Sequence, residues 1–291
     1  MGRTTSILSA LLGMAMTFAL ASAAQATATR TYVSSTGDDT NTATSCPRAN
    51  PCAHFANAYS VTQAGGEIIA LDLGAYGPLT ITTPLSINAL VGAIITVQTG
   101  TVGITVTAGA GNYVILRNFQ ISGAAGSSST TGIKLNTGRL ILQNSSLRGL
   151  TDGLLADSTN NSASVIRAYL ADTDIIGNTR GVRADGTGTD LFGGSPPHGG
   201  NVEVLLWRGN VLGNGTAFRT DHPGHDGNGN YKPTIWIGTI GNAVGVNIQG
   251  NAVVGSGSPV GDCATPATCQ ARTYNPSNQD PQDPDPTLTG P

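Results

Sequence analysis

The densest group of potentially catalytic side chains lies in one short stretch of the chain, from Asp221 to Asn230. Within it, a proline and a glycine separate His222 from His225, and Asp226 follows directly before another glycine. Histidine and carboxylate groups at such spacing can act as general acid and base or as metal ligands. Because glycine and proline are typical of turns, the stretch is also explained as a flexible connection between strands. His222 and His225 are therefore candidate catalytic residues, and Asp221 and Asp226 are candidate metal ligands.

A second group of charged side chains comes from short segments that alternate aliphatic and polar residues. The segments begin with glycine or alanine and span 103–107, 132–136, 153–157, 181–185 and 217–221. Successive side chains of a strand point to opposite faces, so the aliphatic members point inward and the others outward. If these strands stack in register, the outward side chains form two rows. One row is Lys134, Leu155, Arg183 and Arg219, and the next is Asn136, Asp157, Asp185 and Asp221.

The same segments recur at intervals that are typical of a solenoid. A second aliphatic segment that ends in glycine follows each of them, at 115–123, 141–149, 170–177, 206–213 and 248–255. Each coil of a solenoid buries its aliphatic side chains only against the neighbouring coils. The sequence therefore predicts an all-β, single-domain solenoid of parallel strands over 77–262, with a Gly- and Pro-rich insert at 185–200. A β-sandwich or jelly roll is the alternative.

The first residues predict export. Arg3 precedes an apolar stretch at 7–21, which runs into the small residues Ala24-Gln25-Ala26. This pattern indicates a cleaved signal peptide over 1–26, since the apolar stretch is short for a membrane anchor, the alternative interpretation. We therefore expect a secreted or periplasmic protein whose mature form has no membrane span.

Export makes the four cysteines candidates for disulfides. They form two local pairs, and an oxidising compartment favours bonds between Cys46 and Cys52 and between Cys263 and Cys269. The first pair belongs to an N-terminal cap at 27–76. Within the cap we expect a short helix at 51–59 and, at Asp38-Asp39, a turn or a weak cation site. The second pair pins the end of the coils, and the Pro- and Asp-rich remainder of 263–291 predicts disorder.

Composition limits the partners. The chain has 291 residues, 40 of them glycine, and a formal net charge of −3. A protein that binds duplex nucleic acid needs clustered Lys and Arg to neutralise phosphates, so nucleic acid is not an expected partner. We expect a monomer.

The N-terminal cap and the repeats together resemble a known family. The residues that carry this likeness are Arg30-Thr31-Tyr32-Val33-Ser34, Gly37-Asp38-Asp39, Pro51-Cys52, Phe55-Ala56-Asn57-Ala58 and the segment 74–81. They are similar to the start of secreted right-handed parallel β-helix proteins of the pectate-lyase-like superfamily. The resemblance implies that the short helix caps the first coil and covers the end of the solenoid.

The resemblance also assigns chemistry to the two outward rows. Lyases of this kind bind their substrate along such a strip and use an arginine or lysine base, so Arg183 and Arg219 are candidate bases. It implies ligand binding by Lys134, Asp157, Asp185 and Asp221, with Ca²⁺ a candidate cofactor held by Asp157, Asp185 and Asp221. Asp226, from the histidine-containing stretch, is a further candidate metal ligand. The alternative interpretation is ordinary surface ion pairs, each worth about 0 to 1 kcal/mol.

Three functions are consistent with these observations. The first, which we favour because charged and aromatic residues are scarce, is a non-catalytic exported scaffold that binds a polysaccharide or a cell-surface glycan. The second is a polysaccharide lyase or glycoside hydrolase that acts on an acidic polysaccharide such as pectin. The third is an ice-binding or self-associating surface, suggested by the threonines at 80–82 and 105–107, which later segments do not repeat.

Overall fold

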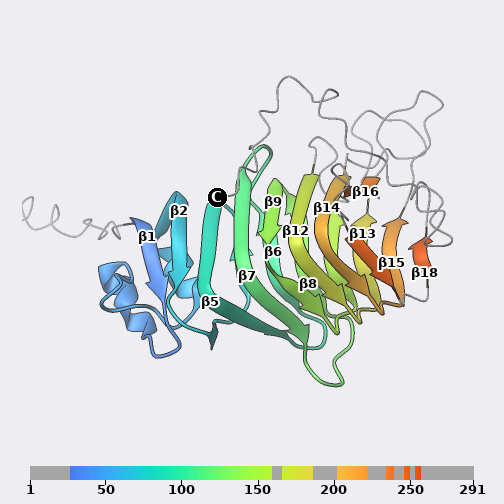
Figure 1. Cartoon of the computed structure of the whole chain (residues 1–291). Coiled ribbons are helices and arrows are strands. Elements are labelled where there is room, and N and C mark those ends of the chain that lie inside the picture. Colours follow the sequence, from blue (N-terminus) through green and yellow to red (C-terminus); the bar gives the residue numbers. More distant parts are fainter. Residues whose placement is uncertain are drawn as a thin grey trace, which may run out of the picture.

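The computed structural model describes residues 27–158, 166–185, 202–221, 234–238, 246–249 and 253–256. Within these ranges almost all regular structure is β-strand, and every strand pairing is parallel (Figure 1). This confirms the all-β, parallel character that the repeats predict. The antiparallel arrangement of sandwiches and jelly rolls is absent from the described strands.

The larger of the two sheets, called the long sheet here, has eleven strands. They are β1 (Ala28–Val33), β2 (Thr62–Ala70), β3 (Gly74–Ala75), β5 (Leu85–Val97), β7 (Tyr113–Gly123), β9 (Arg139–Gln143), β10 (Ser146–Arg148), β12 (Ile166–Ile176), β14 (Val202–Leu212), β16 (Thr234–Gly238) and β17 (Val246–Gln249).

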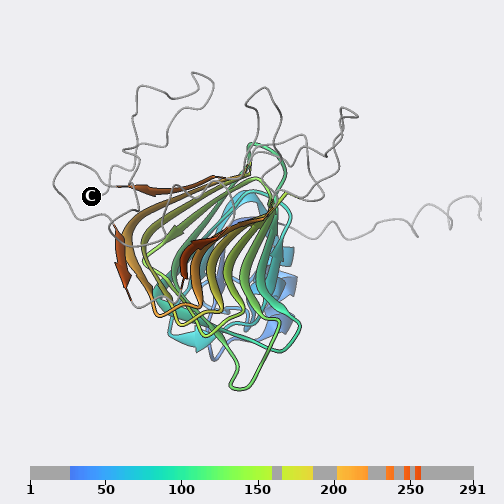
Figure 2. The ribbon, with the colours of Figure 1, turned by 90° about the vertical axis from the view of Figure 1, so that its right-hand side faces the viewer.

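The second sheet, called the short sheet, has seven strands. They are β4 (Leu79–Ile81), β6 (Val102–Thr107), β8 (Thr131–Thr137), β11 (Asp152–Asp157), β13 (Arg180–Asp185), β15 (Thr216–Asp221) and β18 (Val253–Ser256). From β4 onward the chain visits the two sheets in turn, and Figure 2 shows the strands of each sheet lying behind one another in successive layers.

The inward side chains of the short sheet form a continuous row. Its members pair in register from strand to strand and all are fully buried: Ile104, Ile133, Leu154, Val182 and Phe218. These are the positions at which the sequence places the repeating aliphatic residue, so the predicted register of the short sheet is confirmed.

The glycine that opens each repeat has a packing reason. A Cβ atom on Gly132 would lie 2.6 Å from the carbonyl oxygen of Gly153, and one on Gly153 would lie 2.5 Å from that of Gly181. A Cβ on Gly181 would in turn lie 2.6 Å from the carbonyl oxygen of Ala217. Neighbouring backbones of the short sheet therefore approach too closely for a side chain at these positions.

Two segments of the chain bend at places that the aliphatic residues do not mark. The aliphatic runs at 85–87 and 94–97 belong to one strand, β5, whose register with β7 shifts between Asn88 and Ala93. The run at 248–255 is split between β17 of the long sheet and β18 of the short sheet. In both places the spacing of aliphatic residues indicates strands but does not show where the chain bends from one sheet direction to another.

The N-terminal cap covers the outer edge of β1. It contains the 3₁₀ helix η1 (Asp39–Thr44) and the short helix α2 (Phe55–Ser60), which lies within and one residue beyond the predicted helix. Cys46 and Cys52 form the predicted disulfide. The disulfide closes a loop that is hydrogen-bonded to the end of β1. Tyr32 N donates to Cys46 O (2.9 Å), and Ser34 N, just after the strand, donates to Cys52 O (3.0 Å). An exposed strand edge would invite pairing with another chain, and this loop occupies it.

Candidate functional site

The outward face of the short sheet holds the residues that the sequence singles out. Arg183 lies in register with Leu155 on one side and Arg219 on the other, and Leu155 is also in register with Lys134. Asp185 lies in register with Asp157 and Asp221. We call the set of outward charged residues on β8, β11 and β13 the charged strip: Lys134, Asp152, Asp157, Arg180, Arg183 and Asp185.

Each described carboxylate of the charged strip is paired with a cation. Lys134 Nζ lies 2.8 Å from Asp157 Oδ2, and Arg183 Nη2 lies 2.6 Å from Asp185 Oδ2. The aspartate side chains are 10% and 11% exposed, against 30% for Lys134 and 24% for Arg183. The carboxylates therefore lie beneath the cations and hold them in place.

Two members of the charged strip were missed by the sequence interpretation. Arg180 contacts Asp152 through both ends of its guanidinium group, with Nε 2.5 Å from Oδ1 and Nη2 2.7 Å from Oδ2. Arg183 Nη1 lies 4.0 Å from the same carboxylate. A signal for this pair exists in the sequence, because Asp152 and Arg180 both stand directly before the glycine of the repeat. Their equivalence follows once the glycines are aligned.

The charged strip is suited to hydrogen bonding more than to holding a cation. Ion pairs this close satisfy the carboxylates, and a bidentate guanidinium–carboxylate pair has a fixed geometry. Among the described residues no group of three or more His, Cys, Asp or Glu side chains could hold a metal ion. Asp185 faces Arg183, whereas the side chain of Asp221 and the whole of Asp226 lie outside the described residues, so the proposed Ca²⁺ set stays a prediction.

The histidine-containing stretch starts at the end of the charged strip. The backbone of Asp221 ends β15, in register with Asp185. His222, His225 and Asp226 lie outside the described residues, as do Cys263 and Cys269. Their predicted roles stay predictions.

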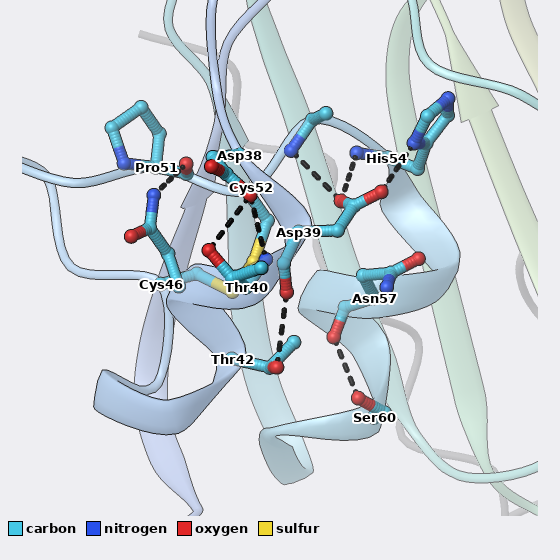
Figure 3. Close-up of polar contacts among 12 residues, drawn as sticks. Asp38, Asp39, Thr40, Thr42, Cys46, Pro51, Cys52, His54, Asn57 and Ser60 are labelled. Atoms are coloured by element: carbon cyan, nitrogen blue, oxygen red, sulfur yellow. Dashed lines mark hydrogen bonds and ion pairs between the residues drawn. A yellow bond between two sulfur atoms is a disulfide. The ribbon is translucent and has the colours of Figure 1, made fainter.

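Asp38 and Asp39, interpreted above as a turn or weak cation site, accept hydrogen bonds from the protein itself (Figure 3). Asp38 Oδ1 accepts hydrogen bonds from the backbone N–H of Thr40 (2.9 Å) and from its hydroxyl group (2.8 Å). Asp39 Oδ1 accepts from the backbone of Ala53 and His54, and its Oδ2 lies 2.6 Å from His54 Nδ1. Burial opposes ionisation of Asp39, but the bonds from His54 and the backbone lower its pKa overall. The pair therefore ties η1 to the start of α2.

No helix in the described part of the chain is long and apolar enough to cross a membrane. Comparison of the chain with family models, with curated proteins and with solved structures finds no match in any of the three.

Proposed function

We propose that this chain is an exported right-handed parallel β-helix protein that binds a glycan along the charged strip. The observation that carries the proposal is the pairing of Asp152, Asp157 and Asp185 with Arg180, Lys134 and Arg183. These ion pairs support a rigid row of hydrogen-bond donors and acceptors in which positive and negative charges nearly balance. Such a row suits the hydroxyl groups of an extended neutral polysaccharide, which need oriented partners at regular intervals.

The arrangement across strands adds a second argument. Neighbouring parallel strands lie about 4.8 Å apart, so equivalent groups repeat along the stack at that interval. Leu155, 8% exposed, lies between Lys134 and Arg183 in register and gives the row a small apolar floor. A chain of sugar rings presents alternating apolar faces and hydroxyl groups, and this row offers complementary partners for both.

Lyase activity is the alternative, favoured by the adjacent positions of Arg183 and Arg219 in register. In that reaction an arginine base would remove the proton next to a uronate carboxylate. The carboxylate of Asp185 already contacts the guanidinium group of Arg183, which favours a structural role for this arginine, and binding is therefore the preferred function.

The test uses a gene for the whole chain, with protein purified from the exported fraction and its mature start, expected after Ala26, checked by intact mass. Titration calorimetry against neutral glucans, galactans and mannans is expected to identify a ligand whose affinity falls about tenfold in Arg183→Gln. Arg30→Gln is the matched control. It removes the exposed ion pair between Arg30 of β1 and Glu67 of β2, and this variant should bind normally.

Two results would overturn the proposal. If none of the polysaccharides binds, or if both variants bind equally well, the charged strip is only structural. If uronate polysaccharides yield unsaturated products that absorb in the ultraviolet, and Arg183→Ala or Arg219→Ala abolishes them, the protein is a lyase.

A further inference from the structure

A second candidate binding surface lies on the long sheet, on a different face from the charged strip. Strands β7, β9 and β12 alternate buried and more exposed side chains, and their outward residues align in three rows. We call this surface the arginine face, after Arg117, Arg139 and Arg167. None of the outward residues at the nine aligned positions of these rows is a carboxylate.

The first row consists of Tyr113, Arg139 and Arg167, in register. Arg139 lies over the ring of Tyr113, with 5.1 Å between the guanidinium carbon and the ring centroid, and its Nη1 donates to the Tyr113 hydroxyl at 2.5 Å. An arginine stacked on an aromatic ring is held in one orientation. On the next strand, the backbone of Glu203 lies in register with Arg167 and marks the border of the arginine face.

Arg117, in the third row, differs from the paired arginines of this protein. Arg30, Arg180, Arg183 and Arg208 each contact a carboxylate. By contrast, the partners of Arg117 among the described residues are uncharged: its Nε donates to Gln143 Oε1 at 2.8 Å, and its Nη1 lies 3.5 Å from Ser86 Oγ. A partly buried cation without a counter-charge is costly, and an anionic ligand would remove that cost.

The middle row is apolar. It contains Ile115, Ile141 and Tyr169 in register, between the two rows that hold the arginines. Ile141 is only 6% exposed, yet it points outward and does not belong to the main hydrophobic core. Its neighbours Leu140 and Leu142 point inward and are fully buried. Aliphatic and aromatic side chains flanked by guanidinium groups can contact the apolar face of a sugar ring while the arginines bind its acidic substituents.

We propose that the arginine face binds an acidic polysaccharide, one that carries carboxylate or sulfate groups, with Arg117 and Arg139 as the principal anion contacts. The charge of this face is opposite to that of such a ligand, although the whole chain has a net charge of −3. A strand-to-strand interval of about 4.8 Å lets a polysaccharide that runs across the strands meet Arg139 and Arg167 in succession. The proposal does not depend on the charged strip, which lies on the short sheet.

The test is titration calorimetry of the mature protein with polygalacturonate, with heparin and with a neutral dextran. Arg117→Gln and Arg139→Gln are each expected to weaken binding of at least one acidic polymer about tenfold, and added salt should weaken it further. Arg117→Lys keeps the charge without the planar fork and should show an intermediate loss. Arg148→Gln is the matched control, because Arg148 is an exposed arginine on β10 of the same sheet.

Several results would overturn the proposal. They are an unchanged affinity in Arg117→Gln, an equal loss in Arg148→Gln, equal binding of dextran and the acidic polymers, or no binding of either acidic polymer. Binding to vesicles of anionic lipid that matches or exceeds binding to the polymers would show a membrane surface instead. Self-association that Arg117→Gln abolishes, measured by analytical ultracentrifugation, would show a second copy as the occupant. If a variant misfolds, native polygalacturonate can be compared with its methyl ester on the wild-type protein, where loss of binding supports the proposal and equal binding contradicts it.

Discussion

At the scale of single residues, hydrogen bonds in the N-terminal cap shift the pKa of Asp72. Burial would raise the pKa of this carboxyl group, but hydrogen bonds from Tyr76, Ser35 and Ser34 lower it to about 2. The donors are the Tyr76 hydroxyl, Ser35 N (2.9 Å) and Oγ (2.8 Å), and Ser34 Oγ (2.9 Å). The Tyr76 side chain is fully buried, and burial together with the carboxylate raises its own pKa. The sequence gives little warning of this cluster, because Ser34 and Asp72 are 38 residues apart.

This cluster predicts a specific pH dependence of stability. Because folding lowers the pKa of Asp72, its stabilisation is present above the unfolded pKa of about 3.9 and is lost as the pH falls through about 2. Tyr76→Phe removes one donor, so the pKa of Asp72 in the folded state should rise toward its unfolded value. The variant should have about 1 kcal/mol less stability at neutral pH, and its acid loss should be smaller and complete at a higher pH. Urea unfolding of both proteins between about pH 2 and pH 6 measures this.

The control for that series is Tyr59→Phe. Among the described residues the Tyr59 hydroxyl contacts Thr82 and Thr83 and no carboxylate, so its removal should lower stability equally at all acidic pH values. Parallel curves for Tyr76→Phe and the wild type would show that the hydrogen bond to Asp72 contributes nothing to its ionisation.

At the scale of strands and turns, the sequence was informative wherever packing repeats. The glycine followed by an aliphatic residue predicted β6, β8, β11 and β13, because each coil needs a close backbone approach and one buried side chain. The charged strip was predicted only in part. Asp152 and Arg180 meet across 28 residues, and the sequence relates them only once the glycines of the repeats are aligned. The arginine face was missed because its residues lie in segments whose aliphatic content suggests a core.

The closely packed glycines of the short sheet, Gly132, Gly153 and Gly181, lead to the prediction at this scale. Gly153→Ala would place a Cβ atom 2.5 Å from the carbonyl oxygen of Gly181, so neighbouring strands must separate. We expect a loss of about 2 to 3 kcal/mol in the free energy of unfolding, as for other overpacked sites. Gly177→Ala is the comparison: Gly177 has a φ of +63° and open space within 4 Å of the place its Cβ would take, so only backbone strain of about 1 kcal/mol is expected. Equal losses in the two variants, by thermal and urea unfolding, would argue against a close-packed corner.

At the scale of the whole molecule, the stack of strands separates surfaces that a compact globule would bring together. Each strand contacts mainly the strands directly before and after it in its own sheet. The charged strip and the arginine face belong to different sheets, so each can be altered without the other. Stability should follow the same rule, because folds whose units contact only their neighbours are approximately sums of the units and of the interfaces between them.

Double-mutant cycles test that rule directly. Leu154 and Val182 are fully buried and in register on adjacent strands, whereas Ile87, also fully buried, lies on β5, which neighbours neither β11 nor β13. Leu154→Ala and Val182→Ala share one cavity, so their combined cost should differ from the sum of the single costs by more than about 0.5 kcal/mol. The costs of Ile87→Ala and Val182→Ala should add to within that margin.

Unfolding in urea measures these free energies. Hydrogen exchange of the single variants shows where each loss of stability lies: protection should fall in strands adjacent to the substitution and persist in distant ones. Strong coupling between Ile87 and Val182 would mean that the coils do not act as neighbours in a row, and that the two proposed binding surfaces are energetically linked.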